Sequence, residues 1–300
     1  MADITRAVVG PFIPQIWANT ALEILRAKIV LAKLVTRDSD VAAFQVGDTL
    51  NIPYPGVFVA NDKAANTPVT LQVPTATTTS VVLNKHKEAS FLIEDVAKAL
   101  ANQDIMARYM DAATIPIAEA IETDLLALYS GFTYTTGVAG TDLTAAMIRA
   151  TRKVMNDNKV PQNARALIVS DKDEVALLGD PALQQYFAYS QTQGIKEGSI
   201  GRLYGFDLYQ SQLVPAIGSA PVSTKNLALD PGAVILAMRA LPDAPAGSGA
   251  QTSVVNDPVS GLTVRCTIGY NISLLAVQCT IDVLYGVAKL RNEKAVVVLS

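Results

Sequence analysis

Two stretches of the chain have the apolar spacing of amphipathic helices. In the first, which begins near Ile13, apolar residues recur mostly three, four or seven positions apart: Trp17, Ala21, Ile24, Leu31 and Leu34. In the second, residues 91–130, they recur every three to five positions: Leu100, Ile105, Tyr109, Ala113, Ile117, Ile121, Leu125 and Leu128. Pro116 lies inside the second stretch, so we expect a kink or a division near Ala113. The first helix either packs on its own core or lies across a neighbouring molecule.

Residues 46–90 have a different pattern, which predicts a long two-stranded hairpin. Gly47 and Asp48 begin a turn that feeds a strand, and a second strand starts at Val81. Prolines interrupt the region between and exclude a helix there: Pro53, Pro55, Pro68 and Pro74. The hairpin has little apolar content of its own, and an isolated hairpin is only marginally stable in water. We therefore expect contacts with something outside the hairpin to order it.

The second half of the chain alternates between helix and strand signals. Thr141 is a candidate N-cap for a helix that runs through Met155, and Ser170 is a candidate N-cap for another. Strand patterns follow at 166–169, at 202–210 and over most of the chain beyond Leu262. Prolines and glycines between 241 and 260 predict an exposed loop. Together these signals predict an α+β fold with one long helix and one long hairpin.

The composition favours association with other molecules. With 300 residues the chain is near the upper limit for a single core, so one elaborated domain and two domains are both open. Half of its residues are hydrophobic and 17% are charged, against about 25% in an ordinary soluble domain. No apolar run reaches the roughly 18 residues that span a bilayer. We expect the chain to bury surface against copies of itself, with a well-packed monomer as the alternative.

Charge and cysteine usage narrow the function classes. The formal net charge is −3 and no block of like charges occurs, so nothing in the sequence indicates a nucleic-acid reader. The first six residues lack a basic region followed by an apolar run, so we expect no signal peptide. Cys266 and Cys279 lie in apolar strand-like segments, far from a Cys-x-x-Cys spacing. We interpret them as reduced core residues, consistent with folding in a cytoplasm.

A search for catalytic groups finds no arrangement that carries a reaction. The single histidine, His86, lies between two lysines, which is typical of a solvated surface residue and excludes a histidine-rich metal site. The segment 198–205 lacks the ending of a phosphate-binding loop, so we interpret its glycines as permitting a tight turn. Carboxylates gather at the start of one helix and on exposed faces of the long helix: Asp171, Asp173 and Glu174, then Glu119, Glu122 and Asp124. We expect no enzyme activity, no cofactor and no metal.

Several segments occur in a recognisable order along the chain. The clearest are Ile281–Gly286 (Ile-Asp-Val-Leu-Tyr-Gly) and the Ile200–Ser211 segment. The others, in order, are 11–17, 47–53, 91–95, 118–126 and 165–170. This order of segments resembles the major capsid (coat) proteins of tailed bacteriophages, which share the Hong Kong 97-type shell fold. The resemblance runs along nearly the whole chain and is weak only at 215–260.

The resemblance implies a fold with five parts. These are an N-terminal arm (1–45), an extended loop (46–90), a peripheral domain with a spine helix (91–139), an axial domain (140–260) and return strands of the peripheral domain (261–300). It further implies residues that contact other subunits, for which the candidates are Trp17, Pro53, Pro55, Phe58, Lys63 and Pro68.

The resemblance also implies a function and partners. Copies form hexamers and pentamers of an icosahedral phage head that encloses double-stranded DNA, which the inner face contacts without sequence specificity. The head assembles in the host cytoplasm, without a membrane, and a separate scaffolding protein and a portal are expected. A cargo-enclosing nanocompartment shell of the same fold is the alternative. A tail protein would form tubes or rings, and an enzyme would need a catalytic group that the sequence does not show.

Overall fold

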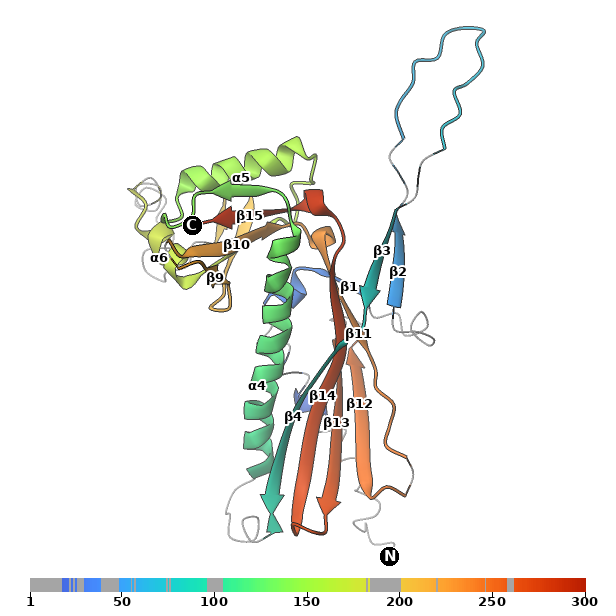
Figure 1. The fold of residues 1–300 in the computed structure, drawn as a ribbon, viewed down its shortest axis with the longest axis vertical. Coiled ribbons are helices and arrows are strands. Elements are labelled where there is room, and N and C mark those ends of the chain that lie inside the picture. Colours follow the sequence, from blue (N-terminus) through green and yellow to red (C-terminus); the bar gives the residue numbers. More distant parts are fainter. Residues whose placement is uncertain are drawn as a thin grey trace, which may run out of the picture.

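The protein consists of an elongated part, a compact part and a projecting hairpin (Figure 1). The computed structural model describes residues 18–21, 23, 25, 30–38, 49–54, 56, 58–73, 75, 77–95, 105–181, 183, 201–219, 221–245, 247–257 and 262–300. Helices and sheets are mixed along the chain, as the α+β prediction required.

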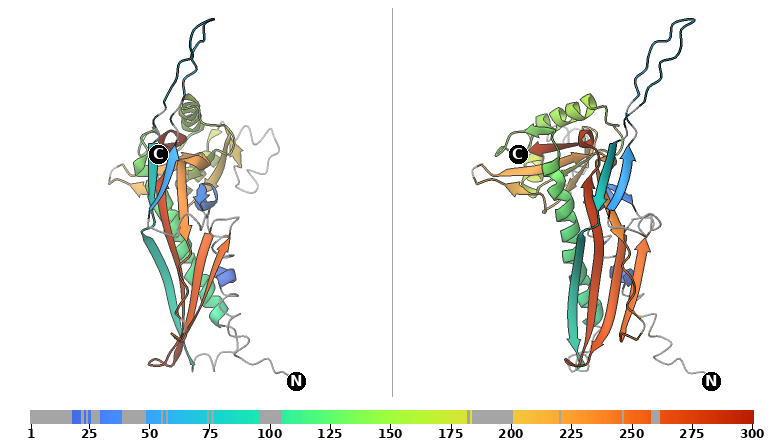
Figure 2. Two further views of the ribbon diagram at one scale, coloured as in Figure 1. Left: turned by 90° about the vertical axis from the view of Figure 1, so that its right-hand side faces the viewer. Right: turned by 45° about the vertical axis from the view of Figure 1, so that its right-hand side comes forward.

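The elongated part is a six-stranded sheet with one long helix, α4 (Ile105–Leu126), along one of its faces (Figures 1 and 2). Its strand order is β1-β11-β14-β13-β12, and β4 also pairs with β14. The strands are β1 (Thr36–Asp38), β4 (Lys85–Glu94), β11 (Val234–Arg239), β12 (Ala250–Asp257), β13 (Leu262–Asn271) and β14 (Ala276–Lys289). The β1–β11 pair is parallel and the others are antiparallel. The longest strand, β14, holds the sheet together because it pairs with three others.

The compact part is a second sheet whose strands follow the order β5-β15-β10-β6-β8-β7, with β9 paired to β10. Its strands are β5 (Thr135–Gly137), β6 (Ala166–Val169), β7 (Arg202–Leu203), β8 (Phe206–Gln210), β9 (Ala216–Ile217), β10 (Ser223–Leu229) and β15 (Ala295–Leu299). Two helices accompany the sheet, α5 (Ala145–Asp157) and α6 (Asp171–Leu178). A short 3-10 helix, η2 (Ala127–Gly131), continues α4 toward this part.

The chain crosses three times between the two sheets, first from β4 to β5 through α4 and η2. The second crossing joins β10 to β11 through η3 (Pro231–Ala233), and the third joins β14 to β15 through η4 (Asn292–Lys294). An ion pair of 2.6 Å between Lys294 and the nearly buried Asp230 ties the second and third crossings together. Neither sheet is therefore independent of the other.

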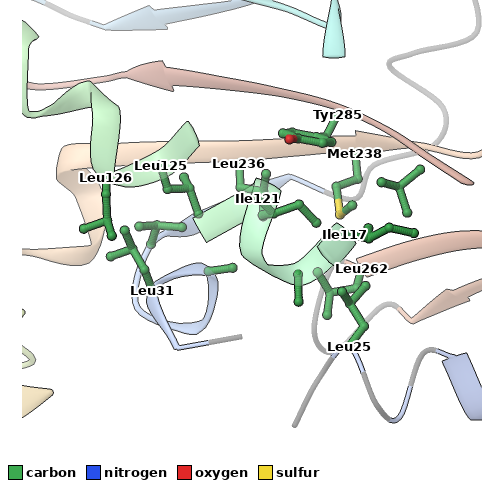
Figure 3. Packing of buried hydrophobic residues seen from close by; sticks show 14 of the residues in the cluster. Leu25, Leu31, Ile117, Ile121, Leu125, Leu126, Leu236, Met238, Leu262 and Tyr285 are labelled. Carbon is green, nitrogen blue, oxygen red and sulfur yellow. The ribbon is translucent and has the colours of Figure 1, made fainter. Parts of the chain in front are cut away.

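The main core lies between α4 and the six-stranded sheet (Figure 3). Ile117, Ile121 and Leu125 of α4 are at most 2% exposed and face β11 and β14. Each such side chain contributes about 1.5–3 kcal/mol by leaving water. The same cluster continues into the compact part through residues such as Leu227 and Val297. The apolar spacing within 105–126 predicted the helix correctly because these apolar residues form this core. The core also explains why the helix continues through the exposed Pro116 without division.

The segment before the hairpin packs on its own subunit. Ala18, Ala21 and Leu25 are fully buried, and η1 (Leu31–Lys33) buries Leu31. The carboxylate of Glu122 on α4 accepts backbone N–H groups from Val30 (2.8 Å), Leu31 (3.0 Å) and Ala32 (3.3 Å). Of the two interpretations of this helix, the described residues support packing on its own core.

Four details of the sequence interpretation are wrong. Residues 91–94 are strand, because Phe91 and Ile93 of β4 turn inward against β14. The N-cap of α5 is Thr144, while Thr141 closes a turn onto the carbonyl of Val138. The expected loop at 241–260 contains β12, which pairs with β13 along its whole length. Glu122 is buried, because its carboxylate binds the N-terminus of η1.

The hairpin β2 (Thr49–Tyr54) and β3 (Thr77–Val82) projects from the elongated part. Its root is anchored by Val81 and Leu83, which pack against Ile235 and Ala237 of β11. Gly286 of β14 makes this crossing feasible, since a Cβ there would lie 2.3 Å from the carbonyl oxygen of Val82.

Candidate assembly surfaces

The loop between β2 and β3 projects away from the rest of the protein (Figure 1). It exposes large apolar side chains to solvent. The exposed fractions are high at five positions: Phe58 64%, Val59 66%, Val69 68%, Leu71 88% and Val73 94%. Residues 67–73 form no strand, so their backbone groups are not in a ladder. Exposed apolar side chains gathered on one segment indicate a contact surface.

The second limb of this loop has the pattern of a strand without a partner. Val69, Leu71 and Val73 alternate with Thr70 and Gln72, so in an extended chain the three apolar side chains share one side. The side chain of Gln72 holds the other limb, since its amide accepts from the N–H of Val59 (2.9 Å) and donates to its carbonyl (2.6 Å). The loop thus presents an apolar edge that is shaped for a further molecule.

A second apolar surface lies at the turn between β13 and β14, at the end of the molecule opposite the hairpin (Figures 1 and 2). Ile272, Leu274 and Leu275 are 79%, 58% and 62% exposed. Beside them the sheet has a hollow of about 420 Å³ whose lining contains no charged residue: Ala250, Thr267, Gly269, Tyr270, Asn271, Ile272, Gln278 and Thr280. We call this surface the distal turn.

The hairpin root is fixed to the rest of the protein by ion pairs. Lys85, at the start of β4, pairs with Asp124 of α4 at 2.6 Å, and the hydroxyl of Tyr285 donates to the same carboxylate at 2.6 Å. Partial burial alone would raise the pKa of Asp124, but the hydrogen bonds from Lys85 and Tyr285 outweigh it and hold the pKa below its ordinary value. The loop therefore projects from an electrostatically anchored base.

His86 takes part in the same base. Its Nε2 lies 2.8 Å from Asp282 Oδ2, and Arg265 Nε donates to Asp282 Oδ1 at 2.9 Å. Asp282 is 3% exposed and the His86 side chain is 52% exposed. The prediction of a surface histidine is confirmed, but His86 also pairs with a buried carboxylate. With both oxygens of Asp282 occupied, the arrangement links β4, β13 and β14 structurally.

Comparison with solved structures identifies the architecture. A chain from Mycobacterium phage Che8 superposes with a TM-score of 0.65 at 18% identity and 90% coverage of both chains. The capsid of cyanophage Pam1 gives a TM-score of 0.63 at 14% identity, with 92% of this chain and 91% of that one covered. The chain has the fold of phage capsid proteins.

An encapsulin also has a similar fold. The holo-SrpI encapsulin complex from Synechococcus elongatus PCC 7942 superposes with a TM-score of 0.55 at 13% identity, covering 89% of this chain and 85% of that one. No protein-family model and no curated protein matches the sequence.

Within the capsid fold, the residues predicted from sequence to contact other subunits fall on the hairpin. Pro53 lies on β2, and Phe58, Lys63 and Pro68 lie on the loop, all exposed. Lys63 donates to the carbonyl of Ala64 at 2.8 Å and so closes the tip of the loop. Trp17 and Pro55 lie outside the described residues. Their contacts with neighbours stay predictions.

The distal turn was missed from sequence, although a signal for it exists. Between Arg265 and Asp282 the chain has no charged residue, which is unusual for a segment that includes an exposed turn. Searching for uncharged runs that contain a turn would have found this surface.

A network of buried polar side chains stabilises the compact part. As predicted, Ser170 caps α6, where its hydroxyl accepts the N–H of Asp173 at 3.2 Å. The Asp173 carboxylate is fully buried, and its Oδ2 accepts hydrogen bonds from four groups: Ser170, Thr224, Asn226 and Ser300. Burial alone would raise the pKa of Asp173, but these hydrogen bonds lower it below its ordinary value. The network joins α6, β10 and the residue after β15.

Cys266 and Cys279 are buried free thiols, as predicted, and their sulfur atoms lie 3.8 Å apart. They occupy diagonal positions on β13 and β14, since Cys266 is opposite Ile281. Diagonal pairs in a sheet are too far apart at the backbone for an unstrained disulfide. Among the described residues, no cluster of histidine, cysteine or carboxylate side chains could hold a metal, and no helix is long and apolar enough to cross a bilayer.

Proposed function

We propose that this chain is the major capsid protein of a tailed phage. Copies assemble into hexamers and pentamers that close an icosahedral head of the Hong Kong 97 type around double-stranded DNA. The observation that carries the proposal is the projecting loop of the capsid fold, with Leu71 and Val73 almost fully exposed. An apolar edge of this kind is stable in water only when another molecule covers it.

The domains of the shell protein follow the expected plan. The arm spans 1–45, the extended loop 46–90, the peripheral domain with its spine helix 91–139, the axial domain 140–260 and the return strands 261–300. Two features support this plan: α4 is a long helix along one face of the elongated sheet, and β14 returns to pair with β4. β11 and β12 are both strands of the elongated sheet, where β11 pairs with β14 and β12 pairs with β13. Part of the 140–260 span therefore packs beside the peripheral domain.

The loop docks on the neighbouring subunit. Its apolar edge, with Phe58 and Pro68, covers part of that subunit, and Lys63 keeps its tip closed. Trp17, Pro53 and Pro55 complete the contact from the arm and from the base of the hairpin. The distal turn supplies a second contact between copies.

The partners follow from assembly. A separate scaffolding protein guides closure, a portal occupies one vertex, and the inner face meets packaged DNA without sequence specificity. Assembly takes place in the host cytoplasm, and the product is the head of the virion. The chain performs no catalysis.

A cargo-enclosing nanocompartment is the second candidate, favoured by the likeness to the encapsulin shell. It differs from a phage head in what the particle contains. A cargo protein that copurifies with the shells and carries a shared docking peptide supports the nanocompartment.

Electron microscopy of particles from cells that express the chain with and without its scaffolding protein tests the proposal. We expect closed icosahedral particles in the presence of the scaffold. A chain that stays monomeric under those conditions, or that forms tubes or flat rings, contradicts a head protein.

A further inference from the structure

A pair of arginines on α5 is held by a turn that is distant in the sequence. Arg149 and Arg152 are three positions apart, so they lie on one face of the helix. Arg149 Nη1 donates to the hydroxyl of Tyr204 at 3.3 Å, and its guanidinium lies 5.6 Å from the centre of that ring. Arg152 Nη1 donates to the backbone carbonyl of Tyr204 at 2.9 Å. One tyrosine therefore orients two cations.

The turn that carries Tyr204 has little freedom to move. Tyr204 and Gly205 join β7 to β8 with φ angles of 48° and 87°, the positive pair typical of a two-residue hairpin turn. The left-handed conformation is unfavourable for a residue other than glycine. At Gly205 a Cβ would lie 3.4 Å from Arg152 Nη1. The strained turn is thus fitted closely around one of the two guanidiniums.

The positive charge of the pair is not neutralised by the described part of the chain. Two neighbouring cations have carboxylate partners, since Lys153 pairs with Asp157 at 2.9 Å and Arg202 with Asp207 at 3.5 Å. Among the described residues, no carboxylate lies within ion-pair distance of Arg149 or Arg152.

We propose that Arg149 and Arg152, oriented by Tyr204, bind the phosphodiester backbone of duplex DNA. A guanidinium has five N–H donors in a planar fork that suits phosphate oxygens. Each of these two gives one hydrogen bond to Tyr204, which leaves the rest of the fork for a ligand. Contacts of this kind neutralise phosphates without reading bases. The inference rests on the proposed function only for the source of the DNA, which is the packaged genome.

Fluorescence anisotropy with a short labelled duplex tests the assignment, with the duplex present before any assembly so that a shell cannot exclude it. The variants are Arg149→Gln with Arg152→Gln, and Lys153→Gln as a control that removes the same kind of charge from the same helix. For each phosphate contact, the association constant falls with about the 0.9 power of the salt concentration. Between about 50 and 200 mM salt, the wild type should therefore lose about twelvefold more affinity than the double variant. Lys153→Gln should keep the wild-type salt dependence.

Three outcomes overturn the proposal: a wild type that does not bind the duplex, a double variant with unchanged salt dependence, or a control that loses as much as the double variant. Displacement of the duplex by inorganic phosphate at matched ionic strength also contradicts it, because that assigns the site to free phosphate. If the double variant does not fold by circular dichroism, Arg149→Gln alone should reduce the salt effect by about 3.5-fold. Electron microscopy of the wild type separates the two claims, since a wild type that forms normal shells but does not bind the duplex refutes only this inference.

Discussion

The segment 18–38 and the loop 58–73 differ in how far their apolar side chains are covered by the rest of the chain. The segment precedes the hairpin, and the loop joins the two strands of the hairpin. From the sequence, both were candidates for contact with a neighbouring molecule. Leu25 in the first segment is fully buried, whereas Leu71 in the second is 88% exposed. The difference lies in what each segment meets within its own chain.

The inner segment finds complementary partners. Its helical spacing matches the face of α4, Glu122 accepts the N–H groups at the start of η1, and β1 pairs with β11. The outer loop has alternating apolar residues without a strand beside them. A segment whose apolar residues recur with the spacing of a buried face folds on its own subunit. A segment with the apolar alternation of a strand, but without a strand paired to it, needs another molecule to cover it.

Deleting the loop should have the largest effect, and only on assembly. Replacing residues 55–78 with a short Gly/Ser link removes the apolar edge but leaves the core untouched. We expect particles to disappear in the electron microscope while the helical circular dichroism and thermal midpoint of the chain stay at wild-type values. Normal particles from the deletion variant contradict the role of the loop.

A matched pair of leucines should separate folding from assembly. Leu25→Ala empties a buried site and should cost about 2–5 kcal/mol in unfolding free energy. Leu71→Ala changes an exposed site and should alter the stability of the unassembled chain by less than about 0.5 kcal/mol, while it weakens assembly. Urea unfolding of the unassembled variants and the critical concentration for shells measure the two effects. Equal losses of unfolding free energy would remove the distinction between the segments.

Two buried carboxylates should respond to pH in opposite directions. The folded pKa of Asp173 is lowered, so its contribution to stability is present above the ordinary carboxyl range and is lost as the pH falls through the folded pKa. Burial raises the folded pKa of Glu122, although its three backbone hydrogen bonds act against the increase. Its contribution is therefore present below the ordinary range and is lost as the pH rises through the folded pKa.

Neutral variants test these signs. Asp173→Asn should cost about 1–3 kcal/mol at neutral pH, and the difference from the wild type should shrink in acid. Glu122→Gln should gain on the wild type as the pH rises. Urea unfolding from pH values below the ordinary carboxyl range up to neutral pH measures both, and parallel curves for wild type and either variant refute the corresponding shift.

The cysteines should matter least. Valine at Cys266 or Cys279 keeps a small apolar side chain in the sheet, so the loss should be about 1 kcal/mol. Reductant should not change the stability of the particles. An intact mass that is two protons lower than the reduced chain would reveal a disulfide and contradict the interpretation as free thiols.

Elements could be predicted from the sequence where the spacing of apolar residues matched a single buried face. The helix over 105–126, the strand at 166–169 and the cap at Ser170 follow from local patterns. The burial of Glu122 and the pairing of His86 with Asp282 could not be predicted, because their partners are 90 or more residues away. β12 was taken for a loop because the prolines and glycines around it outweighed its strand pattern.

Of the assembly surfaces, the hairpin was predictable and the distal turn was not recognised. Prolines and a lack of core residues mark the loop in the sequence, but only the structure shows which side chains are left uncovered. The pair Arg149 and Arg152 also escaped notice, since a net charge of −3 conceals two cations that Tyr204 brings together.

Hydrogen exchange of the chain before and after assembly tests the central claim most directly. The amides of residues 30–38 should be protected in both states, because their partners belong to the same subunit. The amides of residues 67–73 should exchange rapidly in the unassembled chain and become protected in the shell, where a neighbour covers them. Equally rapid exchange of 67–73 in assembled particles would contradict the account.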